Sequence, residues 1–598
     1  MYKKILGFID KKNRILLLFF LLASVLATIL ELVSLSSIPI FLMAVLNFDQ
    51  KDLFFFQYIP FDLKNLDQHT LVLYISLILC SVFLIKNIYL SLLVYFQAIM
   101  AKRFSTTIGA RAFKYYIEAD YNLHVNKNPS IILRTITADT SQTSSLIISY
   151  TYIIKELMVL IGIFTMLLIV DVTLSLAIFT FLSFLVVIFF TLIKKKIFER
   201  AKSIHYLSGQ QLKNINQMTS SIKEIKLMNK ENYFKKLFFN NIILMEKKRV
   251  FNQFFVALPK YYLETIVIFA ITLITMFYIY SNKSLDSFIP MLSLLAVSAI
   301  RLIPSFNTIS LYLTRIKTLR PSFNYLENAL SQKNQDIKFK QEISDSINLK
   351  KGDIITFKDL SFNYQESNTA IIDNMNTSIE LGKTIGLLGS SGAGKTTFID
   401  IFLGLLKPTK GDLFVNKINI SNNIRSWQSQ LGYVPQEINL IDDSIIKNIA
   451  LGIAEDDLDL NHFNKICKCV GLDKTILQTR GSEEESIGSR GAKLSGGQIQ
   501  RIGIARALYS KPKILILDEA LNSLDERSEN EILYNIKNED YIESIILISH
   551  NLELFKQCDN LILIENGKIK FEGKYSLLQN NENFIKIAKK IKTKEYVN

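Results

Sequence analysis

The chain has 598 residues, 49% of them hydrophobic, and a formal net charge of +15. This length excludes a single hydrophobic core, so we expect two or more domains, and the high apolar content is unusual for a soluble protein. The positive charge is compatible with nucleic-acid binding, but Lys and Arg cluster beside apolar runs, as in the cytoplasmic loops of membrane proteins, so we expect no nucleic-acid partner.

The first 14 residues, MYKKILGFIDKKNR, mix basic residues with Ile5, Leu6, Phe8 and Ile9. This pattern predicts an amphipathic segment, residues 1–14, that lies on the cytoplasmic surface of a membrane. The apolar run that follows is too long for the core of a signal peptide and lacks a small-residue cleavage site, so we expect it to stay in the mature protein.

Residues 15–325 contain six apolar runs, each long enough to cross about 30 Å of hydrocarbon as a helix. They are Ile15–Leu46, Thr70–Met100, Ser145–Val170, Thr173–Ile193, Phe254–Tyr280 and Leu285–Leu313. The two long connections, 101–143 and 194–250, are rich in Lys and Arg and compatible with helices that continue beyond the bilayer. The other connections are short and poor in basic residues, which predicts a multi-pass protein of the inner (plasma) membrane with both termini in the cytoplasm.

Five of the charged residues inside these runs need explaining by their depth: Glu31, Lys86, Glu156, Glu264 and Arg301. A charge in the middle of a bilayer costs about 2.5–3.5 kcal/mol on insertion scales, so such residues usually pair or face water. All five lie at a similar depth, and adjacent antiparallel helices would pair Glu31 with Lys86 and Glu264 with Arg301. Two interpretations stay open. These pairs lock the helices together, or Glu31, Lys86 and Arg301 line a wet inward-facing cavity where the cations meet an anionic headgroup.

Residues 326–352 are polar and predict a linker, and residues 353–590 have the composition of a soluble α/β domain. In this domain Thr384–Leu388 predicts a buried strand and Lys395–Leu406 a helix. The loop between them fits the Gly-x-x-x-x-Gly-Lys-Thr pattern of a P-loop (Walker A), whose backbone amides, lysine and helix N-terminus hold phosphates and whose threonine binds Mg²⁺. The predicted phosphate-binding residues are Gly389, Ser390, Ser391, Gly392, Ala393, Gly394, Lys395, Thr396 (also the Mg²⁺ ligand) and Thr397.

Two further strands end in residues suited to phosphate chemistry. The apolar strand in KILILDEA ends in Asp518 and Glu519, and the strand in SIILISH ends in His550. The Asp518 carboxylate is suited to bind Mg²⁺. The Glu519 carboxylate can orient or deprotonate an attacking water, a role typically worth about 10²–10⁴ in rate.

The four cysteines form no disulfide framework, which is consistent with a reducing compartment for the soluble part. Cys467 and Cys469 could be half of a metal site, but only His462 lies nearby in the sequence. We interpret both cysteines as separate buried thiols.

The order of the motifs in the second half resembles a known family. Along the chain follow Tyr364, the P-loop, Gln436 in GYVPQ, LSGGQ (Leu494–Gln498), ILILDE, SLD (Ser523–Asp525) and His550 in SH. This set resembles the nucleotide-binding domain of ATP-binding-cassette (ABC) transporters, and the six spans ahead of it resemble the type IV exporter half-transporter. The resemblance covers nearly the whole chain. It implies a polytopic α-helical membrane domain fused to an α/β P-loop ABC nucleotide-binding domain, with ATP and Mg²⁺ as cofactors.

The resemblance also implies a role for each motif. Glu519, His550 and Gln436 would form the catalytic set, with Gln436 binding Mg²⁺ and His550 contacting the γ-phosphate. Tyr364 would stack on adenine. The residues that would cover ATP bound by the P-loop of a second copy are Ser495, Gly496, Gly497 and Gln498, with Asp525 carrying communication across the dimer. A homodimer with two hydrolysing sites follows.

Two segments of the nucleotide-binding half need a separate comment. IGSRG (Ile487–Gly491) resembles the loop that touches the membrane domain in this family. Family members commonly have Ser-Ala-Leu-Asp where this chain has Asn522-Ser523-Leu524-Asp525. The aspartate is kept, so we expect communication between the two sites to be kept as well.

The substrate is indicated by a looser similarity. The stretches LATILELVSLSSIPIFL, ALPKYYLETI and IRLIPSFN look similar to bacterial lipid-linked oligosaccharide flippases, and DLFFFQYIPFDLKN resembles their short external helix or is simply an apolar loop. This similarity predicts ATP-driven movement of a lipid-linked oligosaccharide or other lipid outward from the inner leaflet, with its tail left among membrane lipids.

Two alternative functions stay open. The chain could export a peptide or drug, although no peptidase-like extension precedes the first span and we expect no coupled leader cleavage. It could also be an ABC protein that regulates without pumping, but such members tend to have a damaged catalytic site, and the intact Glu519 argues against this.

Overall fold

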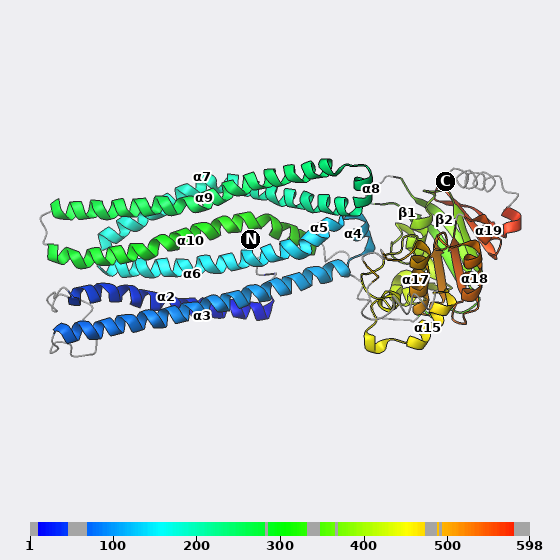
Figure 1. Ribbon diagram of the computed structural model, residues 1–598, viewed down its shortest axis with the longest axis horizontal. Coiled ribbons are helices and arrows are strands. Elements are labelled where there is room, and N and C mark those ends of the chain that lie inside the picture. The colour runs from blue at the N-terminus through cyan, green and yellow to red at the C-terminus, as the bar shows by residue number, and fades with distance from the viewer. Residues whose placement is uncertain are drawn as a thin grey trace. The chain divides into compact units, whose positions relative to one another are not determined.

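The computed structural model describes residues 7, 10–45, 68–170, 172–280, 285–331, 347–364, 369–472, 487–488, 493–549 and 551–578. The chain divides into two compact units, Met1–Ala119 with Leu123–Ile337 and Asp120–Asn122 with Lys338–Asn598. The boundary between Ile337 and Lys338 falls inside the predicted linker 326–352. The first unit is helical, and the second is built from helices and strands (Figure 1).

Long helices that lie side by side make up the first unit (Figure 1). Their bounds are α2 Lys11–Val45, α3 Gln68–Ile117, α6 Thr140–Val170, α7 Val172–Ser220, α9 Glu231–Tyr280 and α10 Leu285–Ser331. Short segments between them are α5 Pro129–Arg134, the π-helical turn η4 Thr135–Asp139, α8 Ile222–Leu227 and α4 Tyr121–Asn126, whose first two residues belong to the second unit. Each predicted apolar run lies within one long helix, apart from Leu46, which is outside the described residues.

Several of these helices are longer than a membrane is thick. Helices α3 and α9 each have 50 residues, which at 1.5 Å per residue makes them about 75 Å long, against about 30 Å of hydrocarbon. The apolar runs occupy only part of each helix. The helices therefore continue beyond the apolar runs, and their position relative to a bilayer stays a prediction. Helix α10 runs to Ser331 and makes the start of the predicted linker helical.

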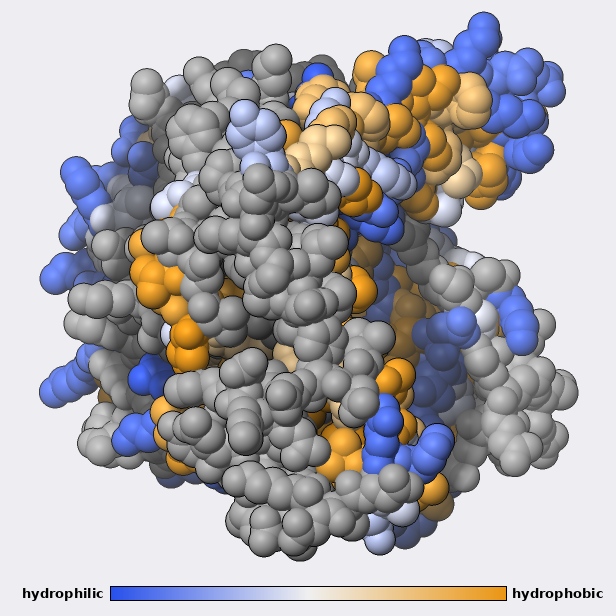
Figure 2. Space-filling view, turned by 90° about the vertical axis from the view of Figure 1, so that its left-hand side faces the viewer, coloured by the Kyte–Doolittle hydropathy of each residue, from blue (hydrophilic) through white to orange (hydrophobic). Residues whose placement is uncertain are grey.

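Four segments of the described residues are long and apolar enough to cross a membrane. They are Lys11–Val45, Gln68–Ile117, Pro129–Ile169 and Glu231–Leu273. On α2, large apolar side chains such as Ile15, Leu18 and Leu22 are exposed, and Figure 2 shows hydrophobic side chains, in orange, at the surface. Contiguous exposed apolar surface is typical of contact with lipid. Helices α7 and α10 hold the other two predicted runs, and the count of six spans stays a prediction.

Helices α2, α3, α6 and α10 share the core of the first unit. Phe20, Phe104, Leu146 and Phe323 from these four helices are almost completely buried in one hydrophobic cluster. Helices α2 and α6 also approach closely at Gly162, where an added Cβ atom would lie 2.9 Å from the side chain of Leu32. A larger residue at this position would therefore have to displace the end of the Leu32 side chain.

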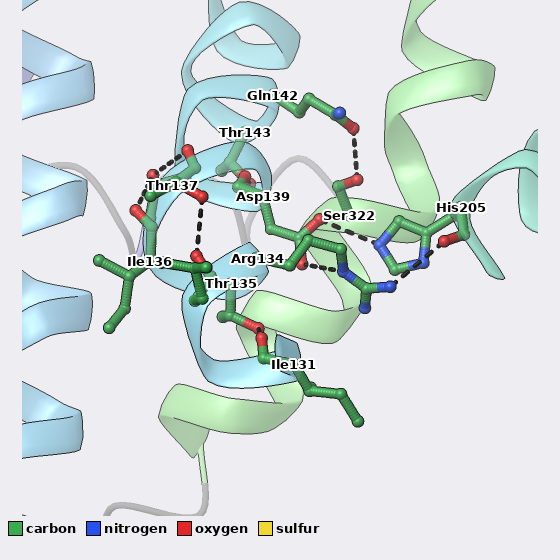
Figure 3. Close-up of polar contacts among 12 residues, drawn as sticks. Ile131, Arg134, Thr135, Ile136, Thr137, Asp139, Gln142, Thr143, His205 and Ser322 are labelled. Atoms are coloured by element: carbon green, nitrogen blue, oxygen red, sulfur yellow. Dashed lines mark hydrogen bonds and ion pairs between the residues drawn. The ribbon is translucent and has the colours of Figure 1, made fainter. Parts of the chain in front are cut away.

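A buried polar cluster lies beside the π-helical turn (Figure 3). The Asp139 side chain, 1% exposed, accepts a hydrogen bond from His205 Nε2 at 3.0 Å and lies 3.5 Å from Arg134 Nε. Arg134 Nη1 donates to the backbone oxygen of His205 at 3.2 Å. The His205 ring stacks on Tyr325 with ring centroids 4.5 Å apart. The cluster therefore connects α5, η4, α7 and α10.

The second unit contains two sheets. The antiparallel sheet has the order β2-β1-β4-β5, with β1 Ile354–Phe362, β2 Ile372–Glu380, β4 Lys410–Val415 and β5 Ile418–Asn419. The second sheet has the order β10-β9-β3-β8-β7-β6, with β3 Thr384–Gly389, β6 Leu431–Val434, β7 Ile514–Asp518, β8 Ser544–Ile548, β9 Asn560–Glu565 and β10 Lys568–Gly573. Strands β9, β3, β8, β7 and β6 are parallel, and β10 runs antiparallel to β9.

The helices of the second unit are mostly short. They are α12 Lys395–Phe402, η5 Ile420–Asn422, α13 Ile424–Gln428, α14 Ile445–Ile449, η6 Glu455–Asp457, α15 Leu460–Cys469, α17 Gly496–Tyr509, α18 Glu526–Lys537, α19 Leu552–Phe555 and α20 Tyr575–Leu578. Helix α12 ends before the predicted Leu406 because Gly404 takes a left-handed φ of +66°, a conformation that ends helices.

Helices α12 and α17 cover opposite faces of the six-stranded sheet. Along β7, Ile516 belongs to the hydrophobic cluster that includes Phe398 of α12. The next residue, Leu517, belongs to the cluster that includes Ile502 of α17. Because neighbouring side chains of a strand point to opposite faces, the two helices lie on different sides of the sheet.

The cysteines of the second unit lie in its core. Cys467, Cys469 and Cys558 are buried, and burial raises the pKa of the three thiols to about 12, 11 and 12. They are therefore protonated at neutral pH. The burial of Cys467 and Cys469 agrees with the predicted buried thiols.

We predict that Asp139→Asn lowers the stability of the protein by about 3–5 kcal/mol, because the buried guanidinium of Arg134 loses its counter-charge while side-chain volume is unchanged. Thermal unfolding of the purified full-length protein in detergent measures this loss. The control is Glu246→Gln, which removes an exposed ion pair with Arg249 (2.8 Å) and should cost no more than about 1 kcal/mol. Equal shifts for the two variants would contradict the prediction.

Candidate functional site

The predicted phosphate loop and the predicted carboxylates start from the same edge of the parallel sheet. Leu387 of β3 and Asp518 of β7 both pair with Ile548 of β8, which lies between them. Strand β3 ends at Gly389 and leads into the loop, and Glu519 follows directly after β7. Because carboxyl ends of parallel strands meet at one edge, the sheet brings the loop and the carboxylates together.

The phosphate loop has the geometry expected of a P-loop. Gly394 takes a left-handed φ of +101° at the N-cap of α12, and at Gly389 an added Cβ atom would lie 2.4 Å from the backbone oxygen of Ile564. The Lys395 ammonium donates to the backbone oxygens of Gly389 at 2.7 Å and Ser390 at 3.1 Å. Thr396 is exposed in the first turn of α12. A phosphate group at this loop would meet backbone amides, the ammonium and a hydroxyl.

The charges around the loop act on one another. Burial lowers the pKa of the Lys395 ammonium, and the Glu519 and Asp518 carboxylates oppose this effect. Burial also raises the pKa of Asp518, which accepts a hydrogen bond from the Tyr433 hydroxyl at 3.2 Å. Burial, together with the charge of Asp518, raises the pKa of Asp400 to about 6. Partly buried carboxylates of this kind suit a divalent cation.

Glu519 takes a strained backbone conformation at the end of β7. Its φ is +51°, in the left-handed region, which costs a residue other than glycine on the order of 1–3 kcal/mol. Gln436 Nε2 donates to Glu519 Oε2 at 2.8 Å, and Asn522 Nδ2 donates to the same oxygen at 3.2 Å. The structure therefore brings Glu519 and Gln436 together, as the sequence predicts. It adds Asn522, whose departure from the family pattern was the signal that could have identified it.

The LSGGQ segment forms a second helix N-terminus. Ser495 is the N-cap of α17 and accepts a hydrogen bond from the Gln498 amide at 3.3 Å, while Gln498 Oε1 accepts one from the Ser495 amide at 2.9 Å. This capping box leaves the first amides of α17, at Gly496 and Gly497, at the helix terminus. Within one chain, α17 and α12 lie on opposite faces of the sheet.

The remaining predicted nucleotide-site residues are spread over other elements. Tyr364 follows β1 and packs edge-on against Phe362, with ring centroids 5.0 Å apart. Asp525 caps α18 by accepting a hydrogen bond from the Ser528 amide at 3.1 Å, and hydrogen bonds from Ser528 lower its pKa. His550 lies outside the described residues, as do Gly491 of the IGSRG segment and the outer stretch DLFFFQYIPFDLKN.

Glu31, Glu156 and Arg301, three of the charges noted in the apolar runs, form one cluster in the first unit. Arg301 Nη2 lies 2.9 Å from Glu31 Oε1 and 3.3 Å from Glu156 Oε2. Ser305 bridges the two sides, because its hydroxyl accepts from Arg301 Nη1 at 2.9 Å and donates to Glu156 Oε2 at 2.8 Å. Both carboxylates are buried.

The predicted pairing of these charges is wrong. Arg301 pairs with Glu31 and Glu156 instead of Glu264, which is exposed on α9. Glu31 is bound to Arg301 instead of Lys86. The reason is that α10 packs against α6 and α2 as well as against its neighbour along the chain, so that helices distant in sequence supply the partners.

Lys86 lies apart from the carboxylates of this cluster. Its ammonium stands over the ring of Phe83, 4.0 Å from the centroid, and is within the electrostatic influence of Glu31 and Arg301. No carboxylate of the described residues forms an ion pair with Lys86. Among the three predicted substrate residues, Lys86 is therefore the cation that is not neutralised by a direct partner.

Residues 372–522 match the family model described as ABC transporter. Among curated proteins the chain is similar to ABC transporter B family member 29, chloroplastic, of Arabidopsis thaliana, with 35% identity over 231 residues (38% of this chain, 36% of that protein). It is also similar to a putative export ATP-binding/permease protein of Rickettsia typhi, with 37% identity over 238 residues (39% and 41%), and to the alpha-hemolysin translocation ATP-binding protein of Escherichia coli, with 37% over 225 residues (38% and 32%).

The matched region spans between 32% and 41% of the length of these three relatives. Among solved structures, the chain is similar to a bacterial Atm1-family ABC exporter with ATP bound, with a TM-score of 0.78 and 17% identity over 95% of this chain and 98% of that one. This likeness establishes the fold, a helical domain fused to an ABC nucleotide-binding domain, over nearly the whole chain.

We predict that Asp400→Asn stabilises the protein at about pH 7.5 by roughly 1 kcal/mol, after allowance for its partial exposure. The pKa of Asp400 is raised to about 6 in the folded state, so the ionised carboxylate disfavours folding above that pH. Below about pH 4 the carboxyl is protonated in the folded and unfolded states, and the gain should vanish. The midpoint of thermal unfolding at several pH values measures both.

The control for this prediction is Asp456→Asn, which changes an exposed carboxylate on η6. It should leave the midpoint unchanged at either pH. A gain for Asp400→Asn that is independent of pH would contradict the electrostatic explanation.

Proposed function

Because the chain has the fold of an ABC exporter with an ABC nucleotide-binding domain, we propose that it hydrolyses ATP to move a substrate across a membrane. The observation that carries the proposal is the convergence of the P-loop, Asp518, Glu519 and Gln436 at one edge of the parallel sheet. In this arrangement Glu519 orients or deprotonates the attacking water. His550 lies outside the described residues, and its proposed contact to the γ-phosphate rests on the family resemblance alone.

The residues of the site fit ATP with Mg²⁺. The backbone amides of the P-loop and Lys395 would hold the phosphates, with Lys395 exchanging its contacts to Gly389 and Ser390 for phosphate oxygens. Thr396, Gln436 and Asp518 offer the oxygen ligands that Mg²⁺ prefers, and Tyr364 would stack on the adenine. Bound Mg²⁺ supplies positive charge that neutralises the phosphate oxygens during transfer.

The active form that we propose is a homodimer. The N-termini of α12 and α17 both suit phosphate, yet within one chain these helices lie on opposite faces of the sheet. A second copy placed head to tail would bring Ser495, Gly496, Gly497 and Gln498 over the P-loop of the first. Since one chain contains one helical unit and one nucleotide-binding domain, a symmetric pair is the simplest complete assembly.

We propose an inner (plasma) membrane location with both termini in the cytoplasm. The support is the four apolar helices of membrane-crossing length among the described residues and the concentration of Lys and Arg in residues 101–143 and 194–250. The exposed apolar surface of α2 would then contact membrane lipid.

The substrate that we propose is a lipid-linked oligosaccharide or another anionic lipid, moved outward from the inner leaflet. Lys86 supports this choice, because it lies deep in an apolar run and forms no ion pair with a carboxylate of the described residues. Arg301 is shared by Glu31 and Glu156, so an anionic headgroup reaching Arg301 would have to compete with two carboxylates.

Export of a peptide or protein is the second candidate. One relative is named for alpha-hemolysin translocation and another for leukotoxin translocation. A non-pumping regulatory protein is less well supported, because Glu519 and Gln436 lie in contact at 2.8 Å, an arrangement suited to hydrolysis.

We predict that Glu519→Gln lowers the steady-state rate of ATP hydrolysis by about 10²–10⁴-fold and traps bound ATP. The side chain keeps its shape but loses the carboxylate that activates water. Phosphate release by the purified protein and retention of labelled ATP measure the two effects. The control is Glu553→Gln, which makes the same change in an exposed glutamate of α19 that pairs with Lys556. Undiminished hydrolysis by Glu519→Gln would refute the catalytic assignment.

We predict that Lys86→Gln leaves thermal stability unchanged. In vesicles it should weaken the stimulation of ATPase activity by a polyprenyl pyrophosphate roughly tenfold, because one charge contact to the headgroup is lost. The matched control is Lys102→Gln, an exposed lysine further along α3. Arg301→Gln should instead lower stability, since it leaves two buried carboxylates unpaired.

The same vesicles, offered a neutral lipid or a peptide, discriminate between the substrate classes. Stimulation by the peptide alone would favour the second candidate. Unchanged stimulation of Lys86→Gln by the pyrophosphate would mean that Lys86 does not contact the headgroup.

A further inference from the structure

Asn522 binds the carboxylate on which the proposed hydrolysis depends. Its side-chain Nδ2 donates to Glu519 Oε2 at 3.2 Å, and Gln436 Nε2 donates to the same oxygen at 2.8 Å. The backbone of Asn522 is also tied to Glu519, because its amide donates to the Glu519 backbone oxygen at 3.3 Å. Glu519 is thus held by two side-chain amides, of which only Gln436 belongs to the catalytic set that the sequence motifs predict.

The backbone around Asn522 keeps its side chain within reach of Glu519. The Glu519 amide donates to the backbone oxygen of Ile548 at 2.9 Å, which anchors Glu519 to the end of β8. On the other side, the Ser523 amide donates to Gln500 Oε1 at 3.0 Å, and Gln500 is a buried residue of α17. Asn522 therefore lies between a fixed strand end and the helix whose N-terminus is LSGGQ.

Side-chain length and chemistry distinguish Asn522 from the serine that the resembled family commonly has at this position. The asparagine amide lies one atom further from the backbone than a serine hydroxyl and offers two N–H donors. Its donor reaches Glu519 Oε2, and this hydrogen bond has an ionised acceptor, which makes it stronger than one between neutral groups.

We propose that Asn522 is a positioning residue for ATP hydrolysis, an inference that rests on the proposed function. If Gln436 served as a Mg²⁺ ligand, the Asn522 amide would still hold Oε2 of Glu519, so that the carboxylate keeps its orientation toward the attacking water. The strained left-handed backbone of Glu519 sets the direction of the side chain, and Asn522 fixes its rotation. Because Ser523 is bound to Gln500, the position of Asn522 also depends on α17.

The test compares three substitutions of Asn522 in the full-length protein, by steady-state ATPase kinetics. Asn522→Ala and Asn522→Ser should lower kcat by roughly 3–10-fold and leave KM for ATP within about twofold, because ATP binding does not use this amide. Asn522→Asp has the same shape but replaces the donor with a second carboxylate. It should therefore lower kcat at about pH 8 at least as much as Asn522→Ala does.

The pH dependence separates a positioning role from a packing role. As the pH falls from about 8 to about 6, the carboxyl introduced by Asn522→Asp gains a proton and can donate to Glu519. The kcat of this variant, relative to that of the unchanged protein, should therefore rise. A residue that only packs would tolerate the isosteric Asn522→Asp at every pH. Wild-type kcat for Asn522→Asp at about pH 8, or for Asn522→Ala, would overturn the inference.

The matched control is Asn376→Ala, which removes an exposed amide that donates to Asp359 Oδ1 at 3.1 Å in the antiparallel sheet. Its kcat should be unchanged. Asn522 is exposed, so the variants should fold, and thermal unfolding verifies this. If the unchanged protein has no ATPase activity, the proposed function fails. If the unchanged protein is active and Glu519→Gln is inactive, the proposed function stands. If the Asn522 variants are then as active as the unchanged protein, only this inference fails.

Discussion

The parallel pairing of β3, β8 and β7 is the constraint on which the nucleotide site depends. Ile548 of β8 is the common partner of Leu387 and Asp518, so the strand before the phosphate loop and the strand before Glu519 are in register across the sheet. Adjacent strands are about 4.8 Å apart, which separates β3 from β7 by about 10 Å. A one-residue slip in either pairing would turn the terminal side chains to the other face and disperse the site.

Charges in a low-dielectric interior impose the second constraint, and they do so twice in the helical unit. Arg301 is bound by two carboxylates from α2 and α6, and Asp139 is bound by Arg134 and His205 from α5 and α7. A buried charge without a partner is costly, so each cluster strongly favours one arrangement of its helices. The helices that carry these residues therefore cannot slide past one another without breaking ion pairs.

The nucleotide-binding unit combines rigid strands with loops whose contacts cross between elements. Gln436, from the segment after β6, and Asn522, from the segment after β7, reach the same oxygen of Glu519. Gln500 of α17 is bound to the residue that follows Asn522. The catalytic glutamate is thus connected by hydrogen bonds to the helix that begins with LSGGQ, which in the proposed dimer serves the nucleotide of the other copy.

The sequence alone determined the elements and the local chemistry of this protein. Apolar runs identified the long helices, and the P-loop, Asp518-Glu519 and LSGGQ were located correctly on strand ends and a helix start, because each depends on residues adjacent in the chain. The assignment of Gln436 and Glu519 to one catalytic set came from the order of motifs in a resembled family, and the structure adds the hydrogen bond between them.

Only the tertiary structure decided which distant side chains meet. Helices adjacent in the chain would pair Glu31 with Lys86 and Glu264 with Arg301. Because α10 packs on α6 and α2, Arg301 instead forms ion pairs with Glu31 and Glu156. The hydrogen bond from Asn522 to Glu519 likewise depends on a left-handed backbone at Glu519. Helix packing and unusual φ angles result from the sum of many contacts, so a local pattern of residues does not specify them.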